Sequence, residues 1–230
     1  MMHTLITPLP ASGRASDAAL PLRPLFDLGD GTLAAAELSL RRMPQAGRSR
    51  LDALSSAMGR ARASVAGDIY ICVTLDGAPL ADPSFPLELA SASACAGSAP
   101  EGACLFFPDS LCRQMGVRLL ESFLTFKRLG FRLGLDVTEL AAMPSLLVER
   151  LPVDVLRLGP ADILGLREDR DACQDILDFT AFCDNLLIVP AARGLANREQ
   201  SVILRELGVQ IGQGPLYARA ESLFLHPGRP

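Results

Sequence analysis

Eight short apolar runs that recur along the chain are the feature that most constrains its fold. They are rich in Val, Ile, Leu and Phe and show continuous rather than alternating apolarity. A strand of this kind is covered on both faces, as in a parallel sheet against which crossover helices pack. The runs are residues 24–28, 32–38, 69–75, 104–108, 131–137, 153–159, 186–192 and 209–214. Eight such strands favour a closed α/β barrel over an open doubly wound sheet.

The segments between the runs carry turn and helix signals. Gly29-Asp30-Gly31 joins the first two runs and tolerates positive φ, so it predicts an antiparallel hairpin at the start of the barrel. Asp109 is expected to cap a helix that ends at Gly130. Asn197 and Gln200 have the spacing of a capping box for the last long helix. Strand and helix therefore alternate to the end of the chain.

Length and composition favour one domain. The chain has 230 residues, 49% of them apolar, which is enough for a single core of barrel size. Residues 1–21 mix Ala, Ser, Gly and Pro without periodicity and are expected to form a flexible leader. The barrel domain is assigned to residues 22–225, followed by a short tail at 226–230. Within it, residues 91–102 are rich in Ala, Ser and Gly and are expected to be a loop or a weakly structured surface segment.

Charge and cysteine content exclude several kinds of partner and site. The formal net charge of −4 gives no basic face, so neither a nucleic acid polymer nor an anionic membrane is expected as a partner. The sequence has no apolar stretch of membrane-spanning length and no signal-peptide pattern, which predicts a cytoplasmic location. The six cysteines form no CxxC pair and most lie in apolar runs. This pattern is typical of reduced, buried thiols.

In a barrel of this class the chemistry lies at the C-terminal ends of the strands. The side chains at those ends are therefore the candidate site residues. They are Glu37, Thr74, Phe106, Asp136, Arg157, Arg193 and Gln213.

Four segments, taken in order, resemble the EAL family of cyclic di-GMP phosphodiesterases, whose barrel also opens with an antiparallel strand. Each segment is a weak signal alone, but their order and spacing are strong together. They are ELSLR at 37–41, RLGFRLGLDV at 128–137, ERLPVDVLRLGPADI at 149–163, and RGLANREQ at 193–200 followed by LRELGVQIGQGPLYARA. The resemblance covers about residues 23–220 and implies a TIM-like (β/α)8 barrel with an antiparallel first strand.

The resemblance also implies which site residues have been lost. Family members hold divalent metal through a glutamate, an asparagine, a second glutamate and paired aspartates on successive strands, and a lysine assists the attack of water. Glu37 and the first aspartate, Asp136, are retained. The changed positions are Thr74 for the asparagine, Phe106 for the second glutamate, Val137 for the second aspartate, Arg157 for the lysine and Arg193 in place of the family's EGVET segment.

These changes predict a degenerate, non-catalytic domain. Two carboxylates are too few oxygen donors for a two-metal site that activates water. Phe and Val offer no lone pair, and Arg does not lose its proton near neutral pH. We therefore expect no metal, no cofactor and no enzyme activity. The resemblance then implies a regulatory module in cyclic di-GMP-type signalling that acts through protein–protein interaction, with the partner and the oligomeric state left open.

Two alternatives remain. In the first, arginines at the strand-end opening hold phosphate without metal, which predicts a metal-independent cyclic di-GMP receptor. The candidate ligand-binding residues are Glu37, Arg41, Asp136, Arg157, Arg193 and Gln213. Against this, Glu37 could pair with Arg41 or Arg157 in a buried ion pair that binds nothing. An active phosphodiesterase is the second and less favoured alternative.

Overall fold

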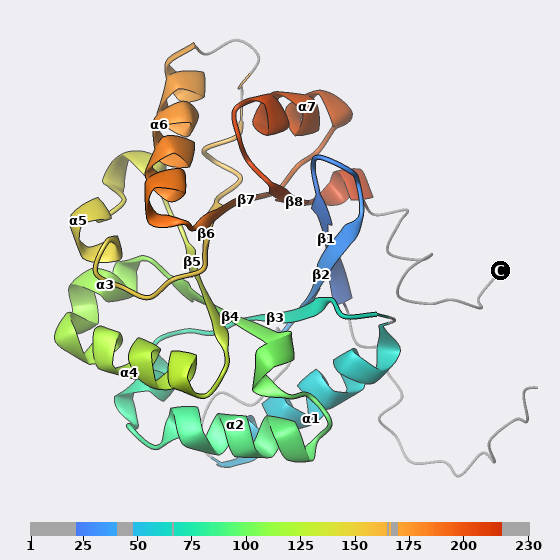
Figure 1. Ribbon diagram of the computed structural model, residues 1–230, viewed down its shortest axis with the longest axis vertical. Helices are drawn as coiled ribbons and strands as arrows, with labels where there is room; N and C mark the ends of the chain where they lie inside the picture. Colours follow the sequence, from blue (N-terminus) through green and yellow to red (C-terminus); the bar gives the residue numbers. More distant parts are fainter. Residues whose placement is uncertain (1–21, 41–47, 66, 165, 167–169, 218–230) are drawn as a thin grey trace, which may run out of the picture.

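The computed structural model describes residues 22–40, 48–65, 67–164, 166 and 170–217. The predicted leader (1–21), the predicted tail (226–230) and Arg41 lie outside the described residues. Figure 1 shows an inner ring of strands with helices on its outer side. Within the described ranges, no helix is long and apolar enough to cross a membrane.

Eight strands close the barrel in sequence order, which confirms the predicted fold class. They are β1 (Leu22–Asp27), β2 (Leu33–Leu38), β3 (Tyr70–Thr74), β4 (Ala103–Pro108), β5 (Arg132–Asp136), β6 (Val155–Leu158), β7 (Val189–Arg193) and β8 (Ile211–Gln213). The strand β1 is antiparallel to both of its neighbours, β2 and β8. The other neighbouring pairs are parallel. Each of the eight apolar runs therefore overlaps one strand of the barrel.

The hairpin between β1 and β2 forms where the glycines predicted it. Gly31 has a φ of 74°, which a residue with a side chain rarely adopts. The Oδ1 atom of Asp27 accepts hydrogen bonds from the backbone N–H groups of Gly29, at 2.7 Å, and Asp30, at 3.2 Å. This Asx-type turn reverses the chain, so β1 enters the barrel in the opposite direction to the other strands.

The helices follow the strands as crossover connections. They are α1 (Arg48–Ser64), α2 (Phe85–Cys95), α3 (Ser110–Met115), α4 (Val117–Arg128), α5 (Ser145–Val148), α6 (Arg170–Leu186) and α7 (Arg198–Glu206). Short 3-10 helices are η1 (Ala78–Ala81), η2 (Pro100–Gly102), η3 (Leu140–Ala142) and η4 (Pro215–Tyr217). Outward-facing strand residues and inward-facing helix residues form one apolar core between these two rings.

The helix predicted from Asp109 to Gly130 is two helices. Gly116, with φ 54° and ψ −123°, breaks the segment between α3 and α4. Asp109 makes no capping bond, and its Oδ1 instead accepts a hydrogen bond of 2.7 Å from the hydroxyl of Thr138. Asp109 is therefore the N-cap residue of α3, as predicted, but its side chain makes no capping bond and bonds Thr138 instead. Gly130, with φ 98°, follows the end of α4 as expected.

The segment 91–102 is more ordered than its composition indicated. Its first five residues belong to α2, and Ser93 is completely buried. The end of α2 packs closely on α1, since a Cβ atom added to Gly59 would lie 2.0 Å from the carbonyl oxygen of Ala96. The first part of the segment therefore lies in a tight helix–helix contact, whereas residues 96–102 form a turn and the 3-10 helix η2.

The capping box of α7 is present with one change of partner. Asn197 Oδ1 accepts a hydrogen bond of 2.9 Å from the backbone N–H of Gln200. The side chain of Gln200 returns to the N–H of Ala196, one residue before the cap, at 2.8 Å. The helix then ends before Gly208, whose φ is 93°.

The cysteines are free thiols, and most of them are buried. Cys72, Cys104, Cys112 and Cys183 lie in the core, whereas Cys95 is exposed. Hydrogen bonding to Cys72, together with burial, raises the pKa of Cys104 well above its ordinary value. Burial also raises the pKa of Cys112 to about 11 and that of Cys183 to about 12. Protonated thiols of this kind are unreactive, and they act as small apolar side chains.

Candidate functional site

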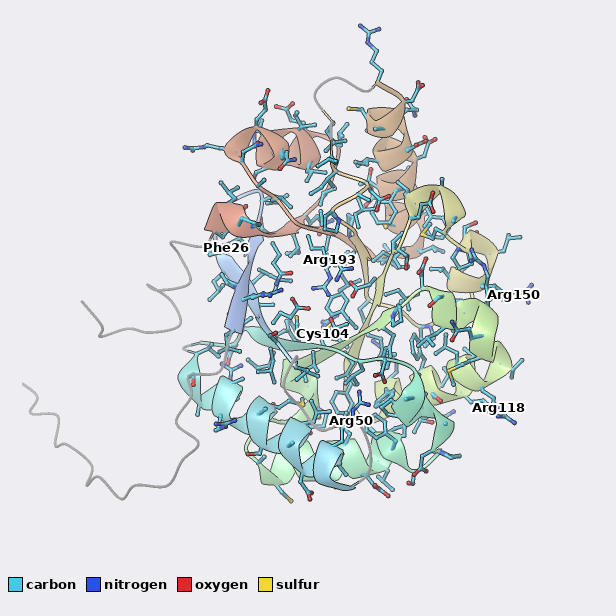
Figure 2. All side chains as sticks on the ribbon, turned by 180° about the vertical axis from the view of Figure 1, so that it is seen from behind. Phe26, Arg50, Cys104, Arg118, Arg150 and Arg193 are labelled. Carbon is cyan, nitrogen blue, oxygen red and sulfur yellow. The ribbon has the colours of Figure 1, made fainter. Side chains whose placement is uncertain are left out.

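The strand ends bring all seven candidate residues to one layer at the C-terminal mouth of the barrel. Side chains alternate along each strand, so one residue near the end of each strand points inward. The layer consists of Arg23, Glu37, Thr74, Phe106, Asp136, Arg157, Arg193 and Gln213. In Figure 2, Arg193 and Cys104 lie inside the ring of strands, whereas Arg118 and Arg150 lie outside it.

Arg23 also belongs to this layer, although it was not among the residues predicted from the sequence. Because β1 is antiparallel, its first residues rather than its last lie at the mouth. Arg23 is the direct register partner of Glu37 on β2. The predicted hairpin was the available signal, since reversing β1 places its N-terminal end beside the C-terminal end of β2.

Val137 does not belong to this layer. It follows Asp136 in sequence, and alternation along the strand points it away from the barrel interior. The structure places it, completely buried, in the apolar core between strands and helices.

Arg157 lies at the centre of the layer and joins the two retained carboxylates. It has no exposed surface. Its Nε donates to Asp136 Oδ1 at 2.7 Å, and its Nη2 donates to Glu37 Oε1 at 3.0 Å and to Thr74 Oγ1 at 3.1 Å. Burial alone would lower the pKa of Arg157, but the carboxylates of Asp136 and Glu37 outweigh it and raise that pKa. The guanidinium is therefore a fixed, permanently charged internal cation.

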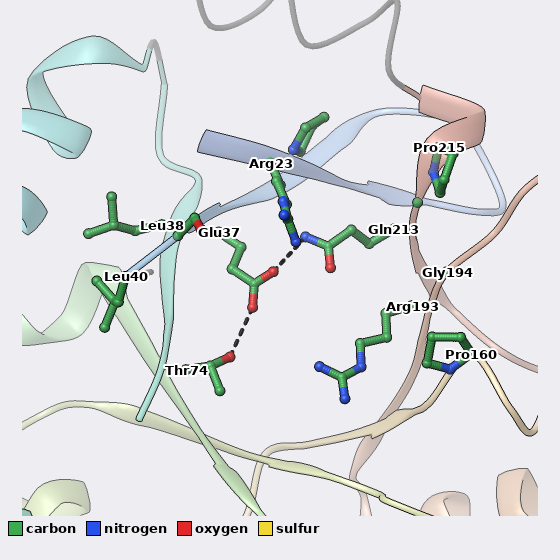
Figure 3. Close-up of a pocket in the computed structure, with 13 residues that line it drawn as sticks. Arg23, Glu37, Leu38, Leu40, Thr74, Pro160, Arg193, Gly194, Gln213 and Pro215 are labelled. Atoms are coloured by element: carbon green, nitrogen blue, oxygen red, sulfur yellow. Dashed lines mark hydrogen bonds between the residues drawn. The ribbon is translucent and has the colours of Figure 1, made fainter. Parts of the chain in front are cut away.

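Glu37 accepts hydrogen bonds on both of its carboxylate oxygens. Its Oε1 atom also accepts a hydrogen bond of 2.9 Å from the hydroxyl of Thr74, and its Oε2 accepts one of 2.9 Å from the side-chain amide of Gln213. Figure 3 shows both of these bonds. Burial would raise the pKa of Glu37, but the charge of Arg157 and the hydrogen bonds outweigh burial, so the pKa is lowered. Glu37 therefore stays ionised near neutral pH.

Phe106 forms the floor beneath the guanidinium. The carbon at the centre of the Arg157 guanidinium lies 4.0 Å from the centroid of the Phe106 ring, the geometry of a cation–π contact. Gly134 on the next strand makes room for the ring, because a Cβ atom there would lie 2.4 Å from it. The aromatic ring and the buried arginine thus occupy the barrel interior together.

The residues of this layer do not fit a divalent metal ion. Glu37 and Asp136 direct their oxygens at the Arg157 guanidinium, at Thr74 and at Gln213. A divalent cation between the carboxylates would be repelled by the buried guanidinium of Arg157, which does not lose its proton near neutral pH. Within the part of the chain that the structure describes, no group of three or more His, Cys, Asp or Glu side chains converges on a possible metal position.

A pocket of about 670 Å³ opens above the layer. Polar groups of Arg23, Glu37, Thr74, Arg193 and Gln213 line it, together with apolar groups from the strand ends. Of the arginines expected to bind phosphate, Arg157 is committed to the carboxylates and only Arg193 faces the pocket among the described residues. The buried ion pair between Glu37 and Arg157, one of the two pairings considered from the sequence, is present.

Comparisons with known proteins agree with this fold. The family model for the EAL domain matches residues 24–220. A comparison with curated proteins finds no match. Among solved structures, the EAL domain of Mycobacterium smegmatis DcpA is 19% identical with a TM-score of 0.75, and the match covers 94% of this chain and 100% of that one.

Two further solved structures are similar. The PaMucR phosphodiesterase, solved as a c-di-GMP complex, is 20% identical with a TM-score of 0.75, over 89% of this chain and 93% of that one. The EAL enzyme Bd1971, in its cGMP-bound form, is 12% identical with a TM-score of 0.73, over 85% of this chain. The chain spans only 59% of the length of the Bd1971 chain. At these identities the similarity shows a shared fold.

Proposed function

The chain belongs to the EAL domain family, and we propose that it is a non-catalytic regulatory member, which acts in cyclic di-GMP-type signalling by binding a protein partner. One observation carries the proposal. The buried guanidinium of Arg157 bridges Glu37 and Asp136, the two carboxylates that would otherwise be available as metal ligands.

The chemistry of the mouth supports the absence of hydrolysis. Cleavage of a phosphodiester by water needs a general base, a group that activates the water by accepting its proton. Glu37 accepts hydrogen bonds on both oxygens, and Asp136 is bound through both oxygens by Arg157. An arginine cannot accept a proton near neutral pH. No described residue of the layer is therefore placed to act as a general base.

A phosphodiesterase assay tests this proposal directly. We expect the purified protein not to convert cyclic di-GMP to the linear dinucleotide with Mg²⁺ or Mn²⁺, under conditions in which an active EAL domain does. Metal-dependent turnover that follows the protein through purification would refute the non-catalytic assignment.

Restoring the family's ligands provides a second test. In the double variant Thr74→Asn, Phe106→Glu, the Arg157 guanidinium still lies between the carboxylates, so we expect no Mn²⁺ binding by calorimetry; Val137 is left unchanged because it lies in the apolar core outside the layer. Adding Arg157→Lys removes the planar guanidinium that joins them, and we expect weak Mn²⁺ binding to appear. Mn²⁺ binding by the double variant itself would show that Arg157 does not block the site.

The protein partner is to be sought by reciprocal pull-down from the source bacterium. We expect one partner to be captured in both directions and to remain bound in EDTA, since the proposed role needs no metal. If no partner co-purifies in either direction, the protein-interaction role is rejected.

A second candidate function is a metal-independent cyclic di-GMP receptor. It is favoured by the position of Arg193 at the pocket and by the c-di-GMP complex of the similar PaMucR structure. Calorimetry with cyclic di-GMP, with and without EDTA, distinguishes the two functions. Absence of heat at tens of micromolar protein would reject the receptor.

A further inference from the structure

Two cysteines lie side by side inside the barrel, one layer below the mouth. Cys72 on β3 and Cys104 on β4 are direct register partners. They precede Thr74 and Phe106 by two residues, so alternation along each strand points all four side chains inward. Figure 2 shows Cys104 inside the ring of strands. Both thiols are 3% exposed and belong to an interior apolar cluster, separate from the core between strands and helices.

The spacing of β3 and β4 suits a disulfide between these two cysteines. Neighbouring strands lie about 4.7–4.9 Å apart, which sets the separation of the Cα atoms of direct register partners. A disulfide needs a Cα–Cα separation of about 4.4–6.8 Å. The thiol of Cys104 is also within hydrogen-bonding reach of Cys72. The two sulfur atoms can therefore be joined without a change of strand register.

The two thiols differ in their surroundings. Hydrogen bonding to Cys72, together with burial, raises the pKa of Cys104, so Cys104 keeps its proton and acts as the donor of the pair. The Arg157 guanidinium lies within electrostatic reach of Cys72. Its Nη1 atom is a buried donor without a hydrogen-bond partner among the described residues. Negative charge that develops on the Cys72 sulfur is therefore stabilised by a thiol donor and a fixed cation, which makes Cys72 the nucleophile.

The cysteine pair lies beneath the pocket at the mouth. Thr74, two residues after Cys72, lines that pocket, and Phe106 with the Arg157 guanidinium covers the interior beside it. A small oxidant in the pocket is therefore separated from the pair by one layer of side chains. Because buried, protonated thiols react slowly, oxidation of the pair should be slower than that of the exposed Cys95.

We propose that Cys72 and Cys104 form a thiol-oxidation site, at which a small peroxide converts the two thiols to an intrachain disulfide that joins β3 to β4. The Cys72 sulfur attacks one peroxide oxygen, the O–O bond breaks, and Cys72 becomes a sulfenic acid. The other oxygen takes the Cys72 proton and leaves as water. The Cys104 sulfur then attacks the Cys72 sulfur, the S–O bond breaks, and the hydroxyl leaves as a second water with the Cys104 proton. The two thiols lose two electrons in total, and the peroxide gains them.

The disulfide changes the stability of the barrel. It closes a loop of chain that contains η1, α2 and η2, and a crosslink across such a loop removes conformational freedom from the unfolded chain. Oxidation should therefore raise the midpoint of thermal unfolding by about 5–15 °C. This response to oxidation does not depend on the proposed non-catalytic role, since the phosphodiesterase assay and the oxidation experiments can succeed or fail separately.

Peptide mapping by mass spectrometry tests the proposal on the full chain. The reduced protein is treated with hydrogen peroxide, and the remaining thiols are alkylated in denaturant. A protease that cleaves after glutamate cuts at Glu88 and Glu101, which places Cys72, Cys95 and Cys104 on different peptides. We expect the peptides of Cys72 and Cys104 to be linked, and dithiothreitol to separate them. If both are alkylated in a sample whose exposed Cys95 is oxidised, the inference is overturned.

Thermal unfolding of three variants assigns the effect to this pair. In Cys72→Ala and in Cys104→Ala, peroxide should no longer raise the unfolding midpoint. Cys112→Ala is the matched control, because Cys112 is equally buried but lies on α3, and this variant should keep the rise. Comparing each variant before and after oxidation removes the cost of the substitution itself. Equal rises in all three variants, or a wild-type midpoint that peroxide leaves unchanged, would refute the disulfide.

Discussion

Replacing Arg157 with methionine is the most informative perturbation of this protein. Methionine keeps an unbranched stem about as long as arginine from Cβ to Nε but lacks the charged guanidinium group. The variant therefore leaves Glu37 and Asp136 buried at 9% and 5% exposure without the cation that joins them. It also removes the cation–π contact with Phe106.

The expected loss of stability is large. Removing one partner of a buried ion pair costs about 3–5 kcal/mol because the other charge is left uncompensated. This is a substantial part of the 5–15 kcal/mol that stabilises an ordinary domain. For a chain of 150–250 residues, each kcal/mol shifts the unfolding midpoint by about 2–4 °C, so a decrease of about 6–20 °C is expected.

The loss should depend on pH in a defined direction. In the wild-type protein the pKa of Glu37 is lowered from its ordinary value of 4.5, so its contribution is present above that pH and is lost as the pH falls through the lowered pKa. Without Arg157, burial dominates and the folded-state pKa of Glu37 should lie above the unfolded value. Protonation then stabilises the folded variant at low pH. The difference between variant and wild type should therefore be largest near pH 7 and should decrease toward pH 4.

Urea denaturation at pH 7 and at pH 4 measures this effect. Arg205→Met is the control, since it removes an exposed arginine on α7 and should change the free energy of unfolding by less than about 0.5 kcal/mol at either pH. Arg157→Lys should retain part of the stability, because it keeps a charge but loses the planar fork. A loss below about 1 kcal/mol at pH 7, or a loss that does not change with pH, would show that Arg157 is not the counter-ion of these carboxylates.

Three further predictions concern the free energy of unfolding, again measured with urea. Gly134→Ala should cost about 1–3 kcal/mol, because the new methyl group overlaps the ring of Phe106; a neutral change would mean that the ring moves freely. Thr74→Val should cost about 1.5–3 kcal/mol, because the hydroxyl that bonds Glu37 is lost, and an unchanged midpoint would contradict this. Asn197→Ala should cost about 1 kcal/mol through loss of the α7 cap, which would be disproved by a stability equal to that of the wild type.

The barrel and the membership of most of its mouth could be predicted from the sequence. A continuous apolar run forms a strand that must be buried on both faces, and this can be recognised from the residues of that run alone. Once the runs are strands of a barrel, the strand ends must meet, which is why all seven candidates lie in one layer. The missing capping bond of Asp109 and the helical residues 91–95 could not be predicted for a common reason: the hydrogen bond from Thr138 to Asp109 and the tight contact at Gly59 are tertiary effects that override local preference.

The sequence alone determined most of the residues that reach the mouth. Local apolar patterns give the positions and order of the strands, and side chains alternate along each strand. Only the tertiary structure decided which arginine bridges the two carboxylates and which arginines line the pocket. Arg157 and Glu37 are separated by 120 positions in the chain, and their contact depends on the stagger of the closed barrel rather than on any spacing in the sequence. The same closure brings Arg23 to the mouth, since an antiparallel first strand presents its beginning where every other strand presents its end.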